Sequence, residues 1–134
     1  MAEHSPYVSV DELVGEIRDG CFLALPKPEG GAAMAATRAL IRRGVKDLYL
    51  FCLPAGGFQA ELLVGAGCVS TIECSGVTLG EAAGIAPRFR AAVESGAVRI
   101  RDATCQALYT AVQAGEKGQP FAPIRGLIGS DVLK

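Results

Sequence analysis

The apolar residues of this chain gather into four short runs, separated by longer stretches of mixed composition. Runs that are this short, apolar and bounded by turn residues are typical of strands buried on both faces of a sheet. Glycines and prolines stand at or near their ends, where chain direction changes. We therefore expect strands at residues 21–25, 47–53, 68–75 and 97–101.

The stretches around these runs have the composition of helices. The first begins at Ser9 and carries Glu12 three residues later, which is the capping-box spacing of a helix start, and Gly20 ends it. The others are rich in helix formers, and one opens with Pro87, a residue that fits the first turn. We expect helices at 9–19, 32–43, 58–67, 87–96 and 103–114.

A helix followed by four strand–helix units predicts an α/β fold. Such alternation favours a mostly parallel sheet with right-handed crossovers and helices on both faces. A length of 134 residues predicts a single domain, residues 1–134.

Composition and charge exclude several classes of protein. Half of the residues are apolar and 20% are charged, with a mean hydropathy of +0.32, which is wrong for a disordered chain. The 13 basic and 14 acidic side chains leave no positive surplus for a nucleic-acid partner. The sequence shows neither an 18-residue apolar run nor the regions of a signal peptide. We expect a soluble, cytoplasmic protein without a membrane partner.

The chain has five cysteines, an odd number with no C-x-x-C pair, namely Cys21, Cys52, Cys68, Cys74 and Cys105. A disulfide scaffold or a zinc site would need a different arrangement, so we expect neither. Most of the cysteines lie in apolar runs, where a free thiol behaves as a small hydrophobe. This pattern also favours a reducing compartment.

Candidate ligand loops follow from the sheet topology, because open α/β sheets bind ligands outside the carboxyl ends of their strands. The relevant loops are 26–31, 54–57, 76–84 and 101–103. The first two contain the glycine pairs Gly30–Gly31 and Gly56–Gly57 and lead into helices, where bare backbone N–H groups can approach an anion or a thioester oxygen. Alternatively, each pair only makes a tight turn.

A self-sufficient catalytic set is not evident. The single histidine, His4, lies near the N-terminus, and Cys105 opens a helix without an evident basic partner. Glu73 in the third strand and Glu81 in the following loop are candidate bases or nucleophiles. Alternatively, Glu73 points into an interface or pairs with an arginine, and Glu81 lies in a solvated loop.

Arg125 is an isolated cation in an apolar, proline-rich stretch. It either pairs with a carboxylate or phosphate, or caps the preceding helix. Arg88 and Arg90 flank Phe89 and are most simply charges on a helix surface.

Three segments, in the correct order, resemble the alpha subunit of the family I CoA-transferases, in the branch of glutaconate CoA-transferase. They are GVKDLYLFCLPAGGFQAELLVGAGCV, GIAPRFRAAVESGAVRI and QPFAPIRGLIGSDVLK. The resemblance covers roughly residues 10–134. It implies the CoA-transferase fold in a shortened form that corresponds to the N-terminal half of the usual alpha chain.

The resemblance also implies a biochemical role. Members of this family move CoA between carboxylic acids through a glutamyl thioester, whose glutamate belongs to the beta subunit in most of the family. The implied substrate is a CoA thioester, with no permanently bound cofactor and no metal. The implied partners are the acyl-CoA and carboxylic acid substrates together with the beta subunit, and activity is expected only in this heteromeric complex.

Within that complex the chain would supply the acyl-CoA pocket and oxyanion contacts. The residues we expect to bind the thioester are Gly30, Gly31, Gly56, Gly57 and Arg125, and no catalytic residue is assigned. Two alternatives stay open: a ring-opening CoA-thioester hydrolase subunit, and a non-catalytic relative that binds CoA or stabilises a partner.

Overall fold

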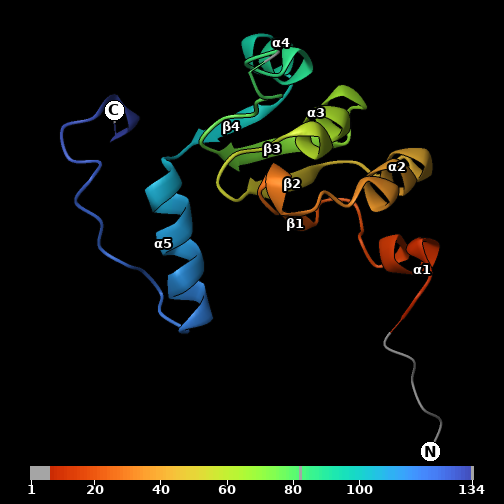
Figure 1. Ribbon diagram of the computed structural model, residues 1–134, viewed down its shortest axis with the longest axis horizontal. Coiled ribbons are helices and arrows are strands. Elements are labelled where there is room, and N and C mark those ends of the chain that lie inside the picture. Colours follow the sequence, from red (N-terminus) through yellow and green to blue (C-terminus); the bar gives the residue numbers. More distant parts are fainter. Residues whose placement is uncertain (1–6, 82, 134) are drawn as a thin grey trace, which may run out of the picture.

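A computed structural model describes residues 7–81 and 83–133 and shows a parallel four-stranded sheet with helices (Figure 1). The strands are β1 (Phe22–Leu25), β2 (Leu48–Cys52), β3 (Val69–Cys74) and β4 (Arg99–Asp102). The α-helices are α1 (Val10–Gly15), α2 (Met34–Arg43), α3 (Phe58–Gly65), α4 (Pro87–Glu94) and α5 (Cys105–Glu116), and two short 3₁₀ helices are η1 (Pro28–Gly30) and η2 (Asp131–Leu133).

The sheet runs in chain order, β1-β2-β3-β4, and every neighbouring pair is parallel. The predicted α/β class and parallel sheet are therefore confirmed, and each expected strand and helix is present. The fourth strand begins two residues later than expected, at Arg99. The reason is the turn after α4: Gly96 adopts a positive φ of 73°, and the Val98 N–H donates to the Ala92 carbonyl.

The first helix is shorter than its apolar stripe suggested and ends at Gly15. Its start is as predicted, because the Ser9 hydroxyl and the Glu12 carboxylate form the capping box. Beyond the helix, the carbonyls of Val14 and Ile17 accept hydrogen bonds from the Arg43 guanidinium at the end of α2. This contact ties the end of α1 to α2.

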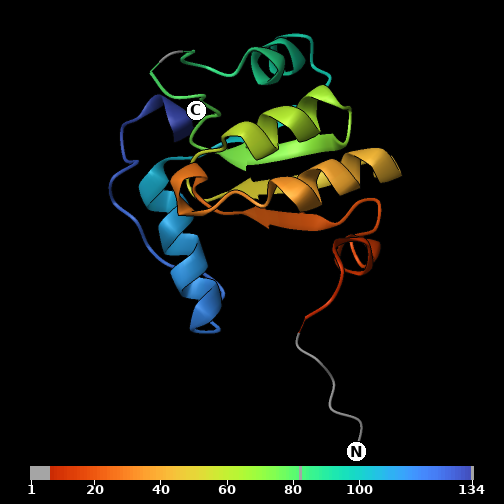
Figure 2. The same ribbon diagram turned by 45° about the vertical axis from the view of Figure 1, so that its right-hand side comes forward.

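The core lies between one face of the sheet and the helices. The strand register aligns Leu23, Leu50, Ile72 and Ile100 across the sheet, so these residues share that face. Leu50 and Ile72 are fully buried in one cluster with residues of α2, α3 and α4. Figures 1 and 2 show α2 and α3 lying side by side on this face.

The opposite face is less evenly covered. Phe22 is 62% exposed at one edge and stacks on Tyr49, with ring centroids 5.0 Å apart, while Phe51 beside them is buried. Arg99 and Arg101 are exposed at the other edge. Helix α5 runs past the carboxyl ends of the strands, and the tail after it returns along the helix (Figures 1 and 2). The carboxyl edge is therefore flanked by α5 and by the loops after β1 and β2.

Candidate ligand site at the carboxyl edge

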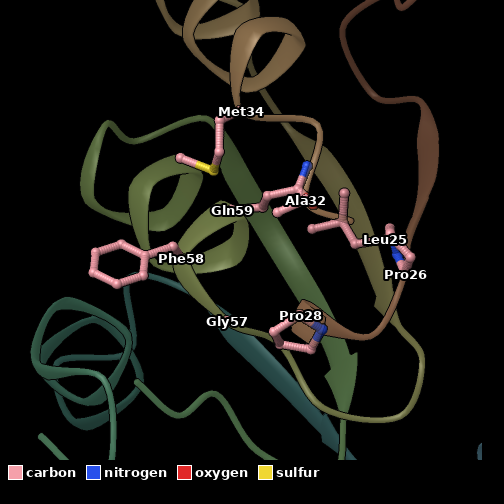
Figure 3. Close-up of a pocket in the computed structure, with 9 residues that line it drawn as sticks. Leu25, Pro26, Pro28, Ala32, Met34, Gly57, Phe58 and Gln59 are labelled. Atoms are coloured by element: carbon pink, nitrogen blue, oxygen red, sulfur yellow. The ribbon is translucent and has the colours of Figure 1, made fainter. Parts of the chain in front are cut away.

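A cavity of about 320 Å³ lies at the carboxyl edge of the sheet, between the loops that follow β1 and β2 (Figure 3). Its lining residues come from the end of β1, the loop into α2 and the start of α3: Leu25, Pro26, Pro28, Ala32, Met34, Gly56, Gly57, Phe58 and Gln59. The cavity thus forms where ligands are expected in an open α/β sheet, and its wall is mainly apolar.

The two loops approach so closely at Gly57 that a side chain does not fit. A Cβ atom built there would lie 2.5 Å from Cγ of Pro28 and 2.8 Å from its Cβ. At Gly56 an added Cβ would lie 2.8 Å from the Cβ of Ala60. The Gly56–Gly57 pair is therefore required for packing: it lets the second loop close against Pro28 and form one wall of the cavity.

One amide side chain in the wall is almost fully buried. Gln59 is 7% exposed, and its Nε2 donates to Oγ1 of Thr37 at 3.0 Å, while the Thr37 hydroxyl donates to the Ala33 carbonyl. Within the described residues the Gln59 Oε1 accepts no hydrogen bond. Every fully enclosed side-chain oxygen of these residues has a hydrogen-bond partner, so the Gln59 Oε1 is not fully enclosed. Because Gln59 lines the cavity, we infer that this oxygen faces it as a hydrogen-bond acceptor.

The start of α3 contributes backbone donors to the same wall. Gly57 is the N-cap residue, and no side chain caps this helix end. The first four N–H groups of an α-helix lack intrahelical acceptors, and the positive end of the helix dipole lies there. Gly57, Phe58 and Gln59 bring this end of α3 to the cavity, so a carbonyl or oxyanion oxygen has donors within the site.

The structure separates the predicted binding residues. Gly56 and Gly57 line the cavity, whereas Gly30 and Gly31 are exposed in the loop between two lining residues, Pro28 and Ala32. Gly31 has a φ of 97°, a conformation that favours glycine and turns the chain from η1 towards α2. Arg125 is exposed in the tail after α5 and is not part of the cavity wall.

The candidate nucleophiles also lie outside the cavity wall. Glu73 accepts a hydrogen bond of 2.5 Å from the Tyr49 hydroxyl, so its observed partner is a tyrosine and not the arginine that one of the alternatives expected. Burial and the Glu73 carboxylate raise the pKa of Tyr49, and the Arg101 guanidinium opposes this. Glu81 is exposed in the loop after β3. Cys105, the first residue of α5, is exposed with its Sγ 3.3 Å from the Ser75 hydroxyl. His4 lies outside the described residues.

Sequence reasoning missed most of the wall. Pro28, Met34, Phe58 and Gln59 were not singled out, because their role depends on which loops meet at the sheet edge. A usable signal was present at Gln59, a polar residue that closely follows a glycine pair and lies between the apolar residues Phe58 and Ala60.

Sites of two other kinds are absent from the described part of the chain. No group of three or more His, Cys, Asp or Glu side chains in residues 7–81 and 83–133 is placed to hold a metal ion. In the same residues no helix has the length and apolar character needed to cross a membrane.

Fold and cavity define an α/β protein with a candidate ligand site at the carboxyl edge of a parallel sheet. The family model described as Coenzyme A transferase matches residues 7–134. The chain belongs to this family.

Curated relatives carry two kinds of name. The chain is 33% identical over 132 residues to the "Cholesterol ring-cleaving hydrolase IpdA subunit" of Rhodococcus jostii, a match that covers 95% of this chain and 43% of that protein. It is 35% identical over 122 residues to one of the subunits of 3-oxoadipate CoA-transferase from Pseudomonas knackmussii, covering 88% of this chain and 42% of the relative. The chain thus spans less than half the length of these relatives.

Solved structures share the fold. A variant of the decarboxylase AibA/AibB matches with a TM-score of 0.84 and 30% identity, over 93% of this chain and 48% of that chain. Glutaconate coenzyme A-transferase from Acidaminococcus fermentans matches with a TM-score of 0.85 and 23% identity, over 94% and 40%. The expected CoA-transferase fold is therefore confirmed.

Proposed function

We propose that this chain is an alpha-type part of a CoA-transferase and that it holds the acyl-CoA substrate while CoA moves between carboxylic acids. The observation that carries the proposal is the apolar cavity beside the uncapped start of α3, in a chain that the CoA-transferase model matches over residues 7–134. Members of this family act on CoA thioesters, so the thioester is a substrate here and not a resident cofactor.

The composition of the wall supports different roles for two kinds of chain: this chain binds the substrate, and another chain supplies the nucleophile. None of the described residues that line the cavity carries a carboxylate, thiol, hydroxyl or imidazole. Covalent transfer of CoA needs a nucleophile, so in this proposal the nucleophile comes from another chain. We assign it to a glutamate of the beta subunit, and we expect activity only in the heteromer.

This chain's own residues would bind and orient the thioester. The free N–H groups at the start of α3 donate to the thioester oxygen, where negative charge develops during acyl transfer. The apolar wall excludes water from the reacting carbon, which strengthens these hydrogen bonds. Gly57 is needed in this arrangement because a larger residue would collide with Pro28 and displace one loop.

Two further expectations belong to the proposal. Arg125, exposed in the tail, remains the predicted cation for the phosphates of CoA, together with the predicted contributions of Gly30 and Gly31. A cytoplasmic location is supported by the free cysteines of the described chain, three of which are buried as unpaired thiols.

A second candidate function is hydrolysis of a CoA thioester substrate, with cleavage of a ring bond. The match over 132 residues to a protein named as a ring-cleaving hydrolase subunit favours it. On this candidate the same cavity binds the thioester, but no carboxylic acid acceptor takes part.

One experiment tests the proposal and separates the two candidates. The chain is co-expressed with a beta-type CoA-transferase chain, and the purified complex is incubated with an acyl-CoA, with and without an acceptor acid. We expect a new acyl-CoA only when the acceptor is present. Consumption of the substrate without any acceptor would favour the hydrolase, and failure to form a complex with any such chain would count against both.

A further inference from the structure

We infer that the cavity at the carboxyl edge takes an uncharged, apolar acyl chain and rejects an acyl chain that ends in a carboxylate. The inference rests on the proposed function, since it assumes that a CoA thioester binds with its acyl group in this cavity. It goes beyond that function by naming the class of acyl group. Its basis is the wall of the cavity, which can be read residue by residue.

The first observation is the charge of the wall. None of the described residues that line the cavity is a lysine, arginine or histidine. Lys27 stands between two lining prolines, Pro26 and Pro28, but it is exposed and is not part of the wall. A carboxylate moved into such a site loses its hydration without gaining a cation, and this desolvation disfavours binding strongly.

The second observation is the orientation of the buried amide of Gln59. Its Nε2 donates to the Thr37 hydroxyl at 3.0 Å, which orients the amide, and we infer that its Oε1 faces the cavity that Gln59 lines. Turning the amide to present N–H groups would break this hydrogen bond, and the Thr37 hydroxyl could donate to the turned Oε1 only by giving up its own hydrogen bond to the Ala33 carbonyl. The polar side-chain group that the wall offers is therefore the negative end of a dipole, which repels a carboxylate and accepts only from a donor.

The third observation is the apolar surface that remains. Leu25, Met34 and Phe58 contribute large apolar side chains to the wall, and Phe58 is 59% exposed beside the cavity (Figure 3). An apolar acyl chain that covers these side chains removes hydrocarbon surface from water on both partners. In the proposed function the backbone donors at the start of α3 bind the thioester oxygen, and the described wall holds no cation for a carboxylate at the other end of the acyl chain.

This preference separates the chain from two proteins that it resembles. The names of those proteins specify 3-oxoadipate and glutaconate, which are both dicarboxylates. A site for a dicarboxylate needs a cation or a set of donors for the second carboxylate. The described wall of this cavity has no such cation, although the fold is shared.

The test compares the binding of three ligands to the purified chain by isothermal titration calorimetry: butyryl-CoA, glutaryl-CoA and free CoA. We expect butyryl-CoA to bind about tenfold or more tightly than either of the others. Equal binding of all three would overturn the inference while leaving the proposed function standing, because the acyl chain would then lie outside the cavity. Tighter binding of glutaryl-CoA would overturn it too. If no ligand bound, the claim that this chain by itself holds the acyl-CoA would fail and the inference with it, while transfer by the heteromer is tested by the experiment with the beta-type chain.

A matched pair of variants locates the preference. Phe58→Lys places a cation beside the cavity at an exposed position, and it should lower or reverse the preference for butyryl-CoA over glutaryl-CoA. Phe121→Lys makes the same change in the tail, at a residue that is 77% exposed and lines a different cavity, and it should leave the ratio unchanged. An unchanged ratio in Phe58→Lys, or an equal change in both variants, would overturn the assignment to this cavity.

Discussion

Glu61 is a carboxylate buried within α3, at 5% exposure, directly beneath the start of α4. Its two oxygens accept hydrogen bonds from the backbone N–H groups of Arg88 and Phe89, at 2.8 and 2.9 Å. The residue at the N-cap position of α4, Ala86, cannot cap the helix with its own side chain. Glu61 therefore caps α4 from a neighbouring helix and holds α3 and α4 together.

Glu61→Gln should lower the free energy of unfolding by about 2 kcal/mol, because one charged acceptor is replaced by an NH₂ group that faces a backbone N–H. Glu94→Gln is the matched control: its ion pair with Arg90 is exposed, so its loss should cost less than about 1 kcal/mol. Urea unfolding of both variants measures the difference. Equal losses in the two variants would contradict a capping role for Glu61.

Two thiols in neighbouring strands make the free energy of unfolding depend on pH. Burial raises the pKa of Cys52 to about 12 and that of Cys74 to about 11, both from an ordinary value of 9.0. Above pH 9 the unfolded chain releases these protons while the folded chain keeps them. The stability that the two thiols contribute is therefore complete below pH 9 and is lost as the pH rises towards the folded pKa values.

Between pH 8 and pH 10 the two groups should together lower the free energy of unfolding by roughly 2.5 kcal/mol. The double variant Cys52→Ala/Cys74→Ala, although less stable at pH 8, should show a smaller drop over this interval. Cys105→Ala, at an exposed thiol, serves as the control and should keep the wild-type pH dependence. Denaturant titrations at the two pH values measure these changes in the free energy of unfolding. An equal drop in the wild type and the double variant would contradict the assignment of the pH dependence to Cys52 and Cys74.

At the scale of elements, side-chain contacts connect neighbouring strands in addition to the backbone hydrogen bonds of the sheet. Tyr49 of β2 donates its hydroxyl to Glu73 of β3 across the less covered face, and Phe22 of β1 stacks on the same tyrosine. Three adjacent strands are thus connected through one aromatic residue. Cross-strand contacts of this kind stabilise a sheet by fractions of a kcal/mol to about 1 kcal/mol each.

A double-mutant cycle with Tyr49→Phe and Glu73→Gln should show a coupling free energy of about 1 kcal/mol, since the bond is charge-assisted and partly buried. Equilibrium unfolding of the wild type and the three variants gives the value. Additive losses, with a coupling within about 0.3 kcal/mol of zero, would mean that the hydrogen bond contributes nothing to the pairing of β2 and β3.

The order of elements could be predicted from the sequence because the signals are local. Apolar runs, the capping box at Ser9 and the glycine after α2 each act over a few residues, and the structure places strands and helices within about two residues of most of the expected bounds. The shorter first helix is the exception, because its end depends on Arg43, which is distant in sequence.

The candidate site could be predicted only in part. The glycine pair at 56–57 was found from the rule for carboxyl edges, since that rule needs only the strand order. The contact of Pro28 with Gly57 and the hydrogen bond from Gln59 to Thr37 join segments that are more than 20 residues apart. Such contacts follow from how the loops pack, so the sequence pattern alone did not indicate them.

The whole molecule combines the fold of the CoA-transferases with a cavity whose described lining residues include no nucleophile. The chain matches the CoA-transferase model over residues 7–134 but spans 42–43% of two curated relatives. We therefore propose that this chain forms part of the acyl-CoA pocket and that its partner carries out the covalent step. The central claim is that the cavity closed by Gly57 against Pro28 binds a CoA thioester.

The most direct test of that claim is the affinity of butyryl-CoA for Gly57→Ala and Gly15→Ala, with circular dichroism as a check that both variants are folded. An added Cβ at residue 57 meets Pro28, whereas at residue 15, outside the cavity wall, it meets no atom within 4 Å. We predict that Gly57→Ala binds at least about tenfold more weakly than wild type and that Gly15→Ala lies within about twofold of it. Wild-type affinity in a folded Gly57→Ala chain would contradict the assignment of this cavity to the thioester.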